Sequence, residues 1–229
     1  PPPTRLSLPP LARPTSSRVA MMKMTLGLIV GLASLASAVP QPLTQIEEVA
    51  YGGRWFQMYA SFGVKYTFEL GGNCVTADYG ATAVPAEEGL RGATFSVLNT
   101  VRLFPAFARY LPNIFTGIRI NGFAVQSPAS DGSLQVSLGP FANDPAAASY
   151  SAPGNYWIVA LGPVVDGKYD WAVVSDSQQS SLYILTRDVV RFRSDYENSV
   201  LAQVESMGFT GFFNKPLATN QDGCYYDGE

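Results

Sequence analysis

Short apolar-rich runs separated by turn residues dominate the chain from Tyr51 onward. Good turn sequences such as Asp131-Gly132 and Asp166-Gly167 lie between the runs. Sequential strands with short connections favour a meander, and eight strands close a small barrel with room for one ligand. We therefore predict an all-β fold, an eight-stranded antiparallel up-and-down β-barrel, although a β-sandwich also fits the spacing. The expected strands, rich in β-branched and aromatic residues, are Arg54–Ser61, Cys74–Tyr79, Ala93–Val101, Thr116–Gln126, Ser133–Phe141, Asn155–Leu161, Tyr169–Ser175 and Leu182–Arg187.

One stretch near the end of the chain, Val190–Met207, has a different period. Its apolar residues recur every four positions, close to the period of one helix face. They are Phe192, Tyr196, Val200 and Val204. Ser194 and Glu197 have the spacing of a capping box, although the helix can also begin a turn earlier. We expect one C-terminal α-helix packed against the outside of the barrel.

The first 38 residues have the composition of removable segments. Residues 1–20 precede the first Met and are rich in Pro and Ser, which indicates a non-native or untranslated leader. Residues 21–38 predict a secretory signal peptide, with Lys23, an apolar run and a cleavage site at Ala36-Ser37-Ala38. A membrane anchor is the alternative, but the run is shorter than the ~20 residues that a span needs. We therefore expect a secreted protein whose folded domain is 39–229.

Composition excludes several classes of function. A net charge of −3 provides no basic surface for nucleic acid. The chain has no histidine, which removes His-based triads and the usual zinc ligand sets. We therefore expect no metal, no cofactor and no catalysis. The two cysteines, Cys74 and Cys224, most simply form one disulfide in an oxidising compartment, and two free thiols are the alternative.

Several motifs resemble those of the lipocalin family. Gly53-Arg54-Trp55 matches the G-x-W signature, Tyr169-Asp170-Trp171 is similar to the second motif, and Leu185-Thr186-Arg187 closes the last strand. Within the family, the chain looks like the subgroup of apolipoprotein D and the bacterial lipocalins. That likeness covers nearly all of 39–229 and is carried by Asn73–Tyr79, Phe95–Asn99, Ile118–Ala124, Asn155–Ala160 and Asn220–Cys224.

The resemblance implies a closed barrel end and an interior binding site. In the family, the first-strand Trp and the last-strand Arg stack at the closed end, so Gly53, Trp55 and Arg187 would have structural roles there.

If Arg187 points inward, then Tyr183 and Leu185 do too, while Leu182 and Ile184 point outward to the helix. The subgroup's pocket aromatic residue maps to Trp157, which puts Val159 and Leu161 inward, and its pocket Asn maps to Asn99. The expected ligand-binding residues are Trp157, Asn99, Tyr183, Phe95, Val97, Val159 and Leu185, each of which could instead fill the core.

The function expected from this resemblance is transport of a small hydrophobic ligand, such as a fatty acid, sterol, retinoid or carotenoid. The alternatives are a lipocalin-like enzyme acting on a lipid or pigment, and a lipocalin that contacts a membrane or a partner. The segment Arg102–Pro112 is too apolar for an exposed linker and would be a lid, a core plug or a membrane patch. Leu103, Phe104 and Phe107 would make the membrane contact, and an oligomer is also possible.

Overall fold

The computed structural model of the chain describes residues 39–81, 94–103, 117–140, 142, 144 and 147–226. The leader and signal peptide predicted over 1–38 lie outside the described residues, as do Phe104 and Phe107.

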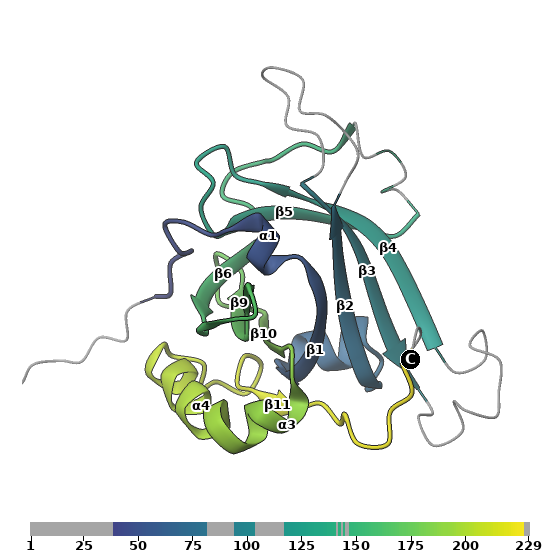
Figure 1. The fold of residues 1–229 in the computed structure, drawn as a ribbon, viewed down its shortest axis with the longest axis vertical. Coiled ribbons are helices and arrows are strands. Elements are labelled where there is room, and N and C mark those ends of the chain that lie inside the picture. Colours follow the sequence, from purple (N-terminus) through teal and green to yellow (C-terminus); the bar gives the residue numbers. More distant parts are fainter. Residues whose placement is uncertain are drawn as a thin grey trace, which may run out of the picture. The chain divides into compact units, whose positions relative to one another are not determined.

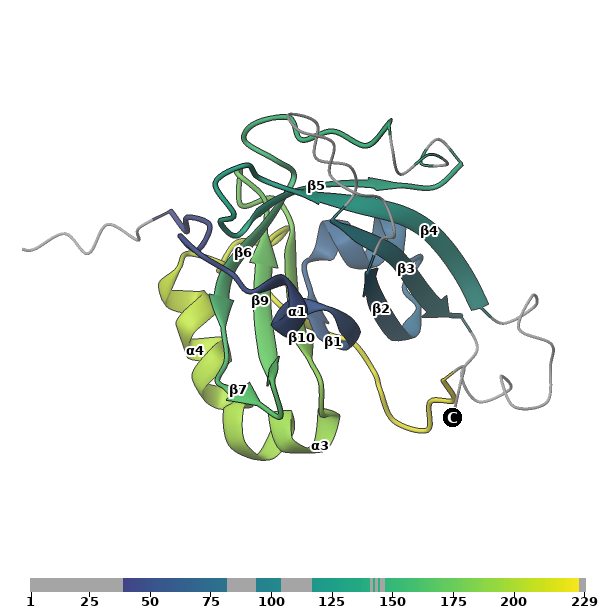
Figure 2. The ribbon, with the colours of Figure 1, turned by 45° about the horizontal axis from the view of Figure 1, so that its top comes forward.

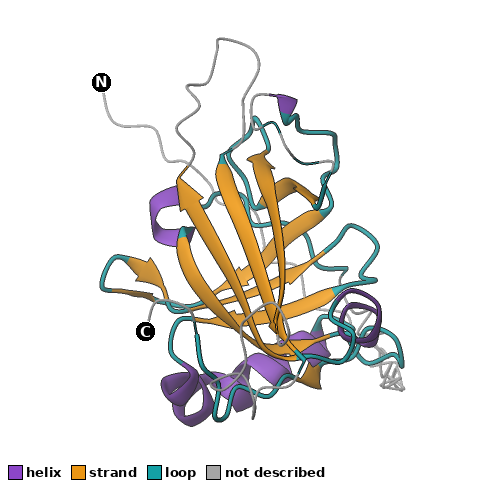
Figure 3. Cartoon of the chain, turned by 90° about the vertical axis from the view of Figure 1, so that its right-hand side faces the viewer, coloured by secondary structure: helices purple, strands orange, loops and turns teal. Residues whose placement is uncertain are grey.

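Eight antiparallel strands form a closed barrel (Figures 1 and 3). Neighbouring strands in the barrel are neighbours in the chain, and β10 pairs back with β1 to close the sheet. This arrangement confirms the predicted up-and-down barrel. The strands are β1 (Gly53–Ala60), β2 (Asn73–Ala81), β3 (Phe95–Arg102), β4 (Gly117–Gln126), β5 (Ser133–Leu138), β6 (Tyr156–Leu161), β9 (Trp171–Ser175) and β10 (Leu182–Thr186).

Short elements lie at the two ends of the barrel. Helix α1 (Glu48–Tyr51) precedes β1, and the hairpin of β7 (Val164–Val165) and β8 (Lys168–Tyr169) lies beside it. The π-helical turn η1 (Val64–Phe68) lies in the connection from β1 to β2, which follows the opposite end of β1. We call the end with α1 the closed end and the end with η1 the open end.

One helix covers the outside of β6, β9 and β10 (Figure 2). It consists of α3 (Val189–Arg191), the π-helical turn η4 (Phe192–Tyr196) and α4 (Glu197–Ser206). The Asp188 carboxylate accepts hydrogen bonds from the backbone N–H groups of Val190 and Arg191, both at 2.9 Å. The helix therefore begins at Val189, and the capping box predicted at Ser194 and Glu197 is wrong because both residues lie inside the helix.

The predicted apolar face of this helix is confirmed. Strand residues Leu182 and Ile184, expected to point outward, pack against it. A four-residue spacing drifts around a regular α-helix, and the wider turn η4 compensates for part of that drift. All four predicted residues of the helix, Phe192, Tyr196, Val200 and Val204, are in this outer cluster, together with Val189 and Leu201.

The C-terminal segment fills the gap that opens where β2 diverges from β1. Strand β11 (Leu217–Ala218) pairs with β1 beyond the last β1–β2 pair. Further on, the buried Gln221 donates from Nε2 to the carbonyls of Gln57 in β1 (2.8 Å) and Val75 in β2 (2.9 Å). Cys224 then forms the predicted disulfide with Cys74, 150 residues earlier.

Candidate functional site

The closed end is built around Arg187. Its guanidinium carbon lies 3.5 Å from the centre of the Trp55 ring, the predicted cation–π stack. Its Nη2 donates to the carbonyls of Tyr51 (2.6 Å) and Gly52 (3.0 Å), at the C-terminus of α1, where a cation is favoured. These contacts are consistent with the structural role expected of Trp55 and Arg187 at the closed end.

The backbone conformation at the start of β1 requires a glycine at position 53. Its φ is +101°, a conformation that side-chain-bearing residues rarely adopt. A Cβ there would also lie 3.4 Å from Nη1 of Arg187. The glycine of the G-x-W motif therefore allows the chain to leave α1 and pass close to the guanidinium.

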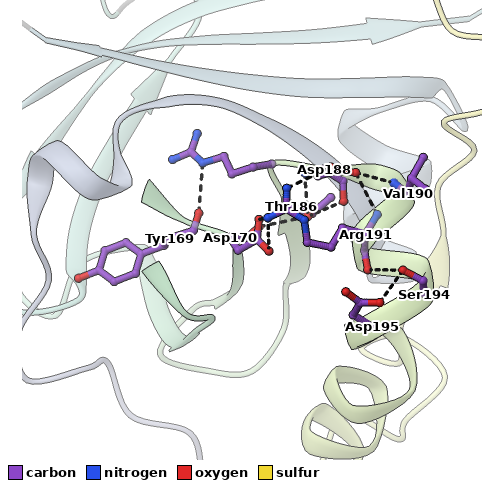
Figure 4. A network of polar contacts seen from close by, with 9 residues as sticks. Tyr169, Asp170, Thr186, Asp188, Val190, Arg191, Ser194 and Asp195 are labelled. Atoms are coloured by element: carbon purple, nitrogen blue, oxygen red, sulfur yellow. Dashed lines mark hydrogen bonds and ion pairs between the residues drawn. The ribbon is translucent and has the colours of Figure 1, made fainter. Parts of the chain in front are cut away.

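A polar network ties the closed end to the start of the outer helix (Figure 4). Asp170 is 3% exposed, and its carboxylate accepts from Nη1 of Arg191 at 3.2 Å. The backbone carbonyl of Asp170 accepts from the Thr186 hydroxyl at 3.1 Å. The predicted second motif therefore joins β8–β9 to the helix through Asp170, while its Tyr169 packs against the side chains inside the barrel.

Most of the predicted ligand-binding residues face the interior. Phe95, Val97, Tyr183 and Leu185 belong to the cluster of side chains inside the barrel. Asn99 continues the face of β3 that carries Val97, because strand side chains alternate. Its cross-strand neighbour Ala77 packs against the interior cluster.

Trp157 and Val159 face the wrong way for the predicted role. Both belong to the outer cluster beneath the helix, while Tyr156 and Ile158 face the interior. The Trp157 indole N–H donates to the Pro153 carbonyl at 2.7 Å. The predicted inward face of this strand is therefore one position too late at Trp157 and Val159, because a shift of one residue turns a strand side chain to the opposite face.

Three tyrosines that the sequence analysis did not select form the polar centre of the interior. Tyr156 Oη lies 2.6 Å from Tyr51 Oη and accepts from Tyr79 Oη at 2.9 Å. The three hydroxyls have one proton each, and these two hydrogen bonds use two of the three protons. We call these residues the tyrosine triad. It retains one donor for a further acceptor.

The triad is neutral at physiological pH. Burial raises the pKa of Tyr51 and Tyr156 well above the ordinary tyrosine value and that of Tyr79 to about 12. The charge of Arg187 at the closed end opposes this shift at Tyr51 and Tyr79 only in part. The other side chains of the interior cluster are aromatic or aliphatic, with the Phe95 ring 5.9 Å from the ring of Tyr79. Apolar surroundings with a neutral hydrogen-bond donor suit an apolar molecule that carries an acceptor.

A surface pocket of about 310 Å³ beside the closed end is a weaker candidate. Its cations are already paired: Arg191 with Asp170, Arg54 with Asp78 at 2.8 Å, and Lys168 with the Val49 carbonyl. An apolar ligand would gain little from such a lining.

An aromatic cluster lies on the surface next to the open end. Phe212 and Phe213 are 63% and 67% exposed, and their rings lie 5.0 Å and 5.8 Å from that of Phe62. The ring of Tyr66, 52% exposed, lies 4.8 Å from Phe62. This exposed aromatic cluster was not predicted, and Leu103 of the predicted patch is half-buried.

The part of the chain that the structure describes contains no group of three or more His, Cys, Asp or Glu side chains placed to hold a metal ion. Within the same residues, none of the helices has the length and hydropathy needed to cross a membrane.

Comparison with known proteins points to one family. Residues 115–218 match the family described as "Lipocalin-like domain", a stretch that runs from β4 to β11 and covers somewhat less than half of the chain. No match was found among curated proteins.

Several solved structures with similar chains come from arthropods. Insecticyanin from the tobacco hornworm Manduca sexta has 12% identity and a TM-score of 0.48, covering 82% of this chain and 88% of that one. The amine binding protein of Rhodnius prolixus, solved with tryptamine, has 16% identity and a TM-score of 0.47, with 83% and 90% covered. H1 crustacyanin from the lobster Homarus americanus has 15% identity and a TM-score of 0.42, with 84% and 95% covered. The fold itself follows from the strand pairings described above.

Proposed function

We propose that the chain is a secreted lipocalin, similar to the apolipoprotein D subgroup, that binds a small hydrophobic molecule inside its barrel. The tyrosine triad carries this proposal, because it offers a spare hydrogen-bond donor within an apolar interior. The match to the lipocalin-like domain over 115–218 supports the family. The Cys74–Cys224 disulfide supports an oxidising compartment.

In this proposal the protein binds its ligand and does not catalyse a reaction on it. A lipocalin-like enzyme would need a nucleophile and a base, and here both cysteines are joined in one disulfide and the sequence has no histidine. Fatty acids, sterols, retinoids and carotenoids are the ligand classes that we propose to test.

The test is a fluorescence titration of the oxidised chain with one member of each class. Trp55 is fully buried in the interior cluster and reports occupancy by quenching. Tyr156→Phe removes both hydrogen bonds of the triad, so the Tyr51 and Tyr79 hydroxyls are no longer oriented by a common partner. Binding of an acceptor-bearing ligand should therefore weaken by about 3- to 10-fold, the effect of one well-placed hydrogen bond.

Matched controls lie on the outer face. Tyr59→Phe removes a hydroxyl that donates to Glu197 of the helix at 2.8 Å, and it should leave binding unchanged. Trp157→Phe should also leave it unchanged, because Trp157 packs outside the barrel. Absence of saturable quenching by every ligand would contradict the proposal.

A second candidate function is contact with a membrane surface. The predicted contact through Leu103, Phe104 and Phe107 remains a proposal, and the exposed aromatic cluster favours a different site for it. Flotation of the chain with phosphatidylcholine vesicles should then be lost in the double variant Phe212→Ser/Phe213→Ser. Equal flotation of both proteins would exclude the cluster as the contact.

A further inference from the structure

Lys65 is a buried cation without a hydrogen-bond partner among the described residues. Its side chain is 8% exposed, and its Nζ is shielded from solvent. An ammonium has three donors, and burying it without a partner is costly. A residue of this kind is expected to meet an acceptor in the functional state.

The surroundings of Lys65 place it on the interior side of the open end. Glu69, four residues later and 5% exposed, accepts a hydrogen bond through Oε2 from Gln57 Nε2 at 3.0 Å. Gln57 follows Trp55 by two positions on β1, so both face the interior. Burial and, to a smaller extent, the charge of Glu69 raise the pKa of Tyr183, which packs against the interior cluster.

Glu69 does not supply the hydrogen-bond acceptor that the Lys65 ammonium lacks. Among the described residues, no ion pair within 4.0 Å joins the two side chains, and the Glu69 carboxylate is held by Gln57. Gln57 is in turn fixed by a second hydrogen bond from Nε2 to the Thr219 hydroxyl at 3.0 Å. Burial lowers the pKa of Lys65, and the negative charge of Glu69 partly opposes that shift. The ammonium is thus attracted by a carboxylate that it does not contact.

We propose that Lys65 binds the carboxylate head of an amphiphilic ligand whose apolar tail lies in the barrel, an inference that rests on the proposed function. Charge-assisted hydrogen bonds from an ammonium to a carboxylate are stronger than neutral ones, and a shielded position strengthens them further. The ligand class is therefore a long-chain or polyene monocarboxylic acid, in preference to its ester or alcohol. The Glu69 carboxylate repels such a head group and limits its affinity.

The experiment compares cis-parinaric acid with its methyl ester, followed by the fluorescence of the polyene. The oxidised chain should bind the acid about tenfold more tightly than the ester, the effect of one charge-assisted hydrogen bond. Lys65→Met keeps the length of the side chain and removes the charge. It should cost about tenfold in affinity for the acid and leave the ester unchanged.

Two more variants separate this role from a structural one. Glu69→Gln keeps an acceptor for Gln57 and removes the repelling charge, so binding of the acid should tighten severalfold. If Lys65 and Glu69 had only a structural role, both Lys65→Met and Glu69→Gln would instead weaken binding of the acid. Lys215→Met, at an exposed lysine, is the charge-matched control and should change neither affinity.

The outcomes distinguish this inference from the proposed function. Equal binding of acid and ester by the unmodified chain would overturn the role of Lys65 and leave a barrel that binds hydrophobic molecules. Binding of neither probe would overturn both proposals. Because the acid-to-ester ratio is measured on the unmodified chain, the test does not depend on the folding of a variant.

Discussion

A single side chain, Arg187, joins three elements at the closed end. Its guanidinium donates to carbonyls of Tyr51, Gly52, Arg54 and Tyr169, which belong to α1, β1 and β8 or lie between them. Burial lowers its pKa to about 10, so the side chain remains a cation at neutral pH. A lysine could supply the charge but not the fork of donors.

We predict that Arg187→Met lowers the free energy of unfolding by about 2–4 kcal/mol, because the variant loses the cation–π stack and leaves several carbonyls without a donor. The measurement is urea unfolding followed by circular dichroism. The matched control is Arg193→Met, which breaks an exposed ion pair with Asp222 at 2.6 Å. Its cost should stay below about 1 kcal/mol, and equal losses in both variants would contradict the role of Arg187.

At the scale of elements, alternation predicts strands well and fails where a strand is irregular. For Leu182–Arg187, alternation predicted correctly which side chains face the interior and which face the helix, because β10 pairs with β9 without interruption. Strand β6 pairs with β9 across a register shift between Ile158 and Ala160, which moves Leu161 onto the interior face. Hydrophobicity alone does not fix the register of β6, since apolar side chains cover both of its faces.

The tyrosine triad could not have been found by local spacing. Tyr51 precedes β1, Tyr79 lies in β2 and Tyr156 begins β6, so the two hydrogen bonds span 105 and 77 residues. Only the closure of the barrel brings them together. One signal was present, because Tyr156 is adjacent to the residue assigned to the pocket.

The start of the outer helix yields an element-scale prediction with a pH dependence. Hydrogen bonds from the backbone N–H groups of Arg191 and Val190 hold the pKa of Asp188 below its ordinary value. The cap therefore stabilises the fold above about pH 3.9, the ordinary pKa of an aspartate, and this contribution is lost as the pH falls through the lowered pKa. Asp188→Ala should cost about 1 kcal/mol at pH 7 and progressively less below pH 4.

This prediction is checked by urea unfolding at several pH values between 2.5 and 7. Glu205→Ala, at an exposed carboxylate near the end of α4, is the control and should show little cost at any pH. A cost for Asp188→Ala that does not change with pH would mean that the charge of the cap contributes nothing.

At the scale of the whole molecule, the C-terminal segment acts as a clamp across β1 and β2. Gln221 donates to both strands, and the Cys74 backbone N–H donates to the Asn220 carbonyl at 2.8 Å. The disulfide keeps this segment close to its binding site on the barrel. It should therefore make each of these hydrogen bonds more effective, because a tethered segment docks at a high effective concentration.

We predict that Cys74→Ser/Cys224→Ser lowers the free energy of unfolding by about 2–4 kcal/mol. Gln221→Leu, which leaves the carbonyls of Gln57 and Val75 without their donor, should cost about 1–3 kcal/mol in the oxidised chain. In the serine background it should cost clearly less, because the untethered segment can already leave the barrel. Urea unfolding of the four proteins gives the coupling energy. Strictly additive losses would show that the disulfide stabilises the fold without helping the segment to dock.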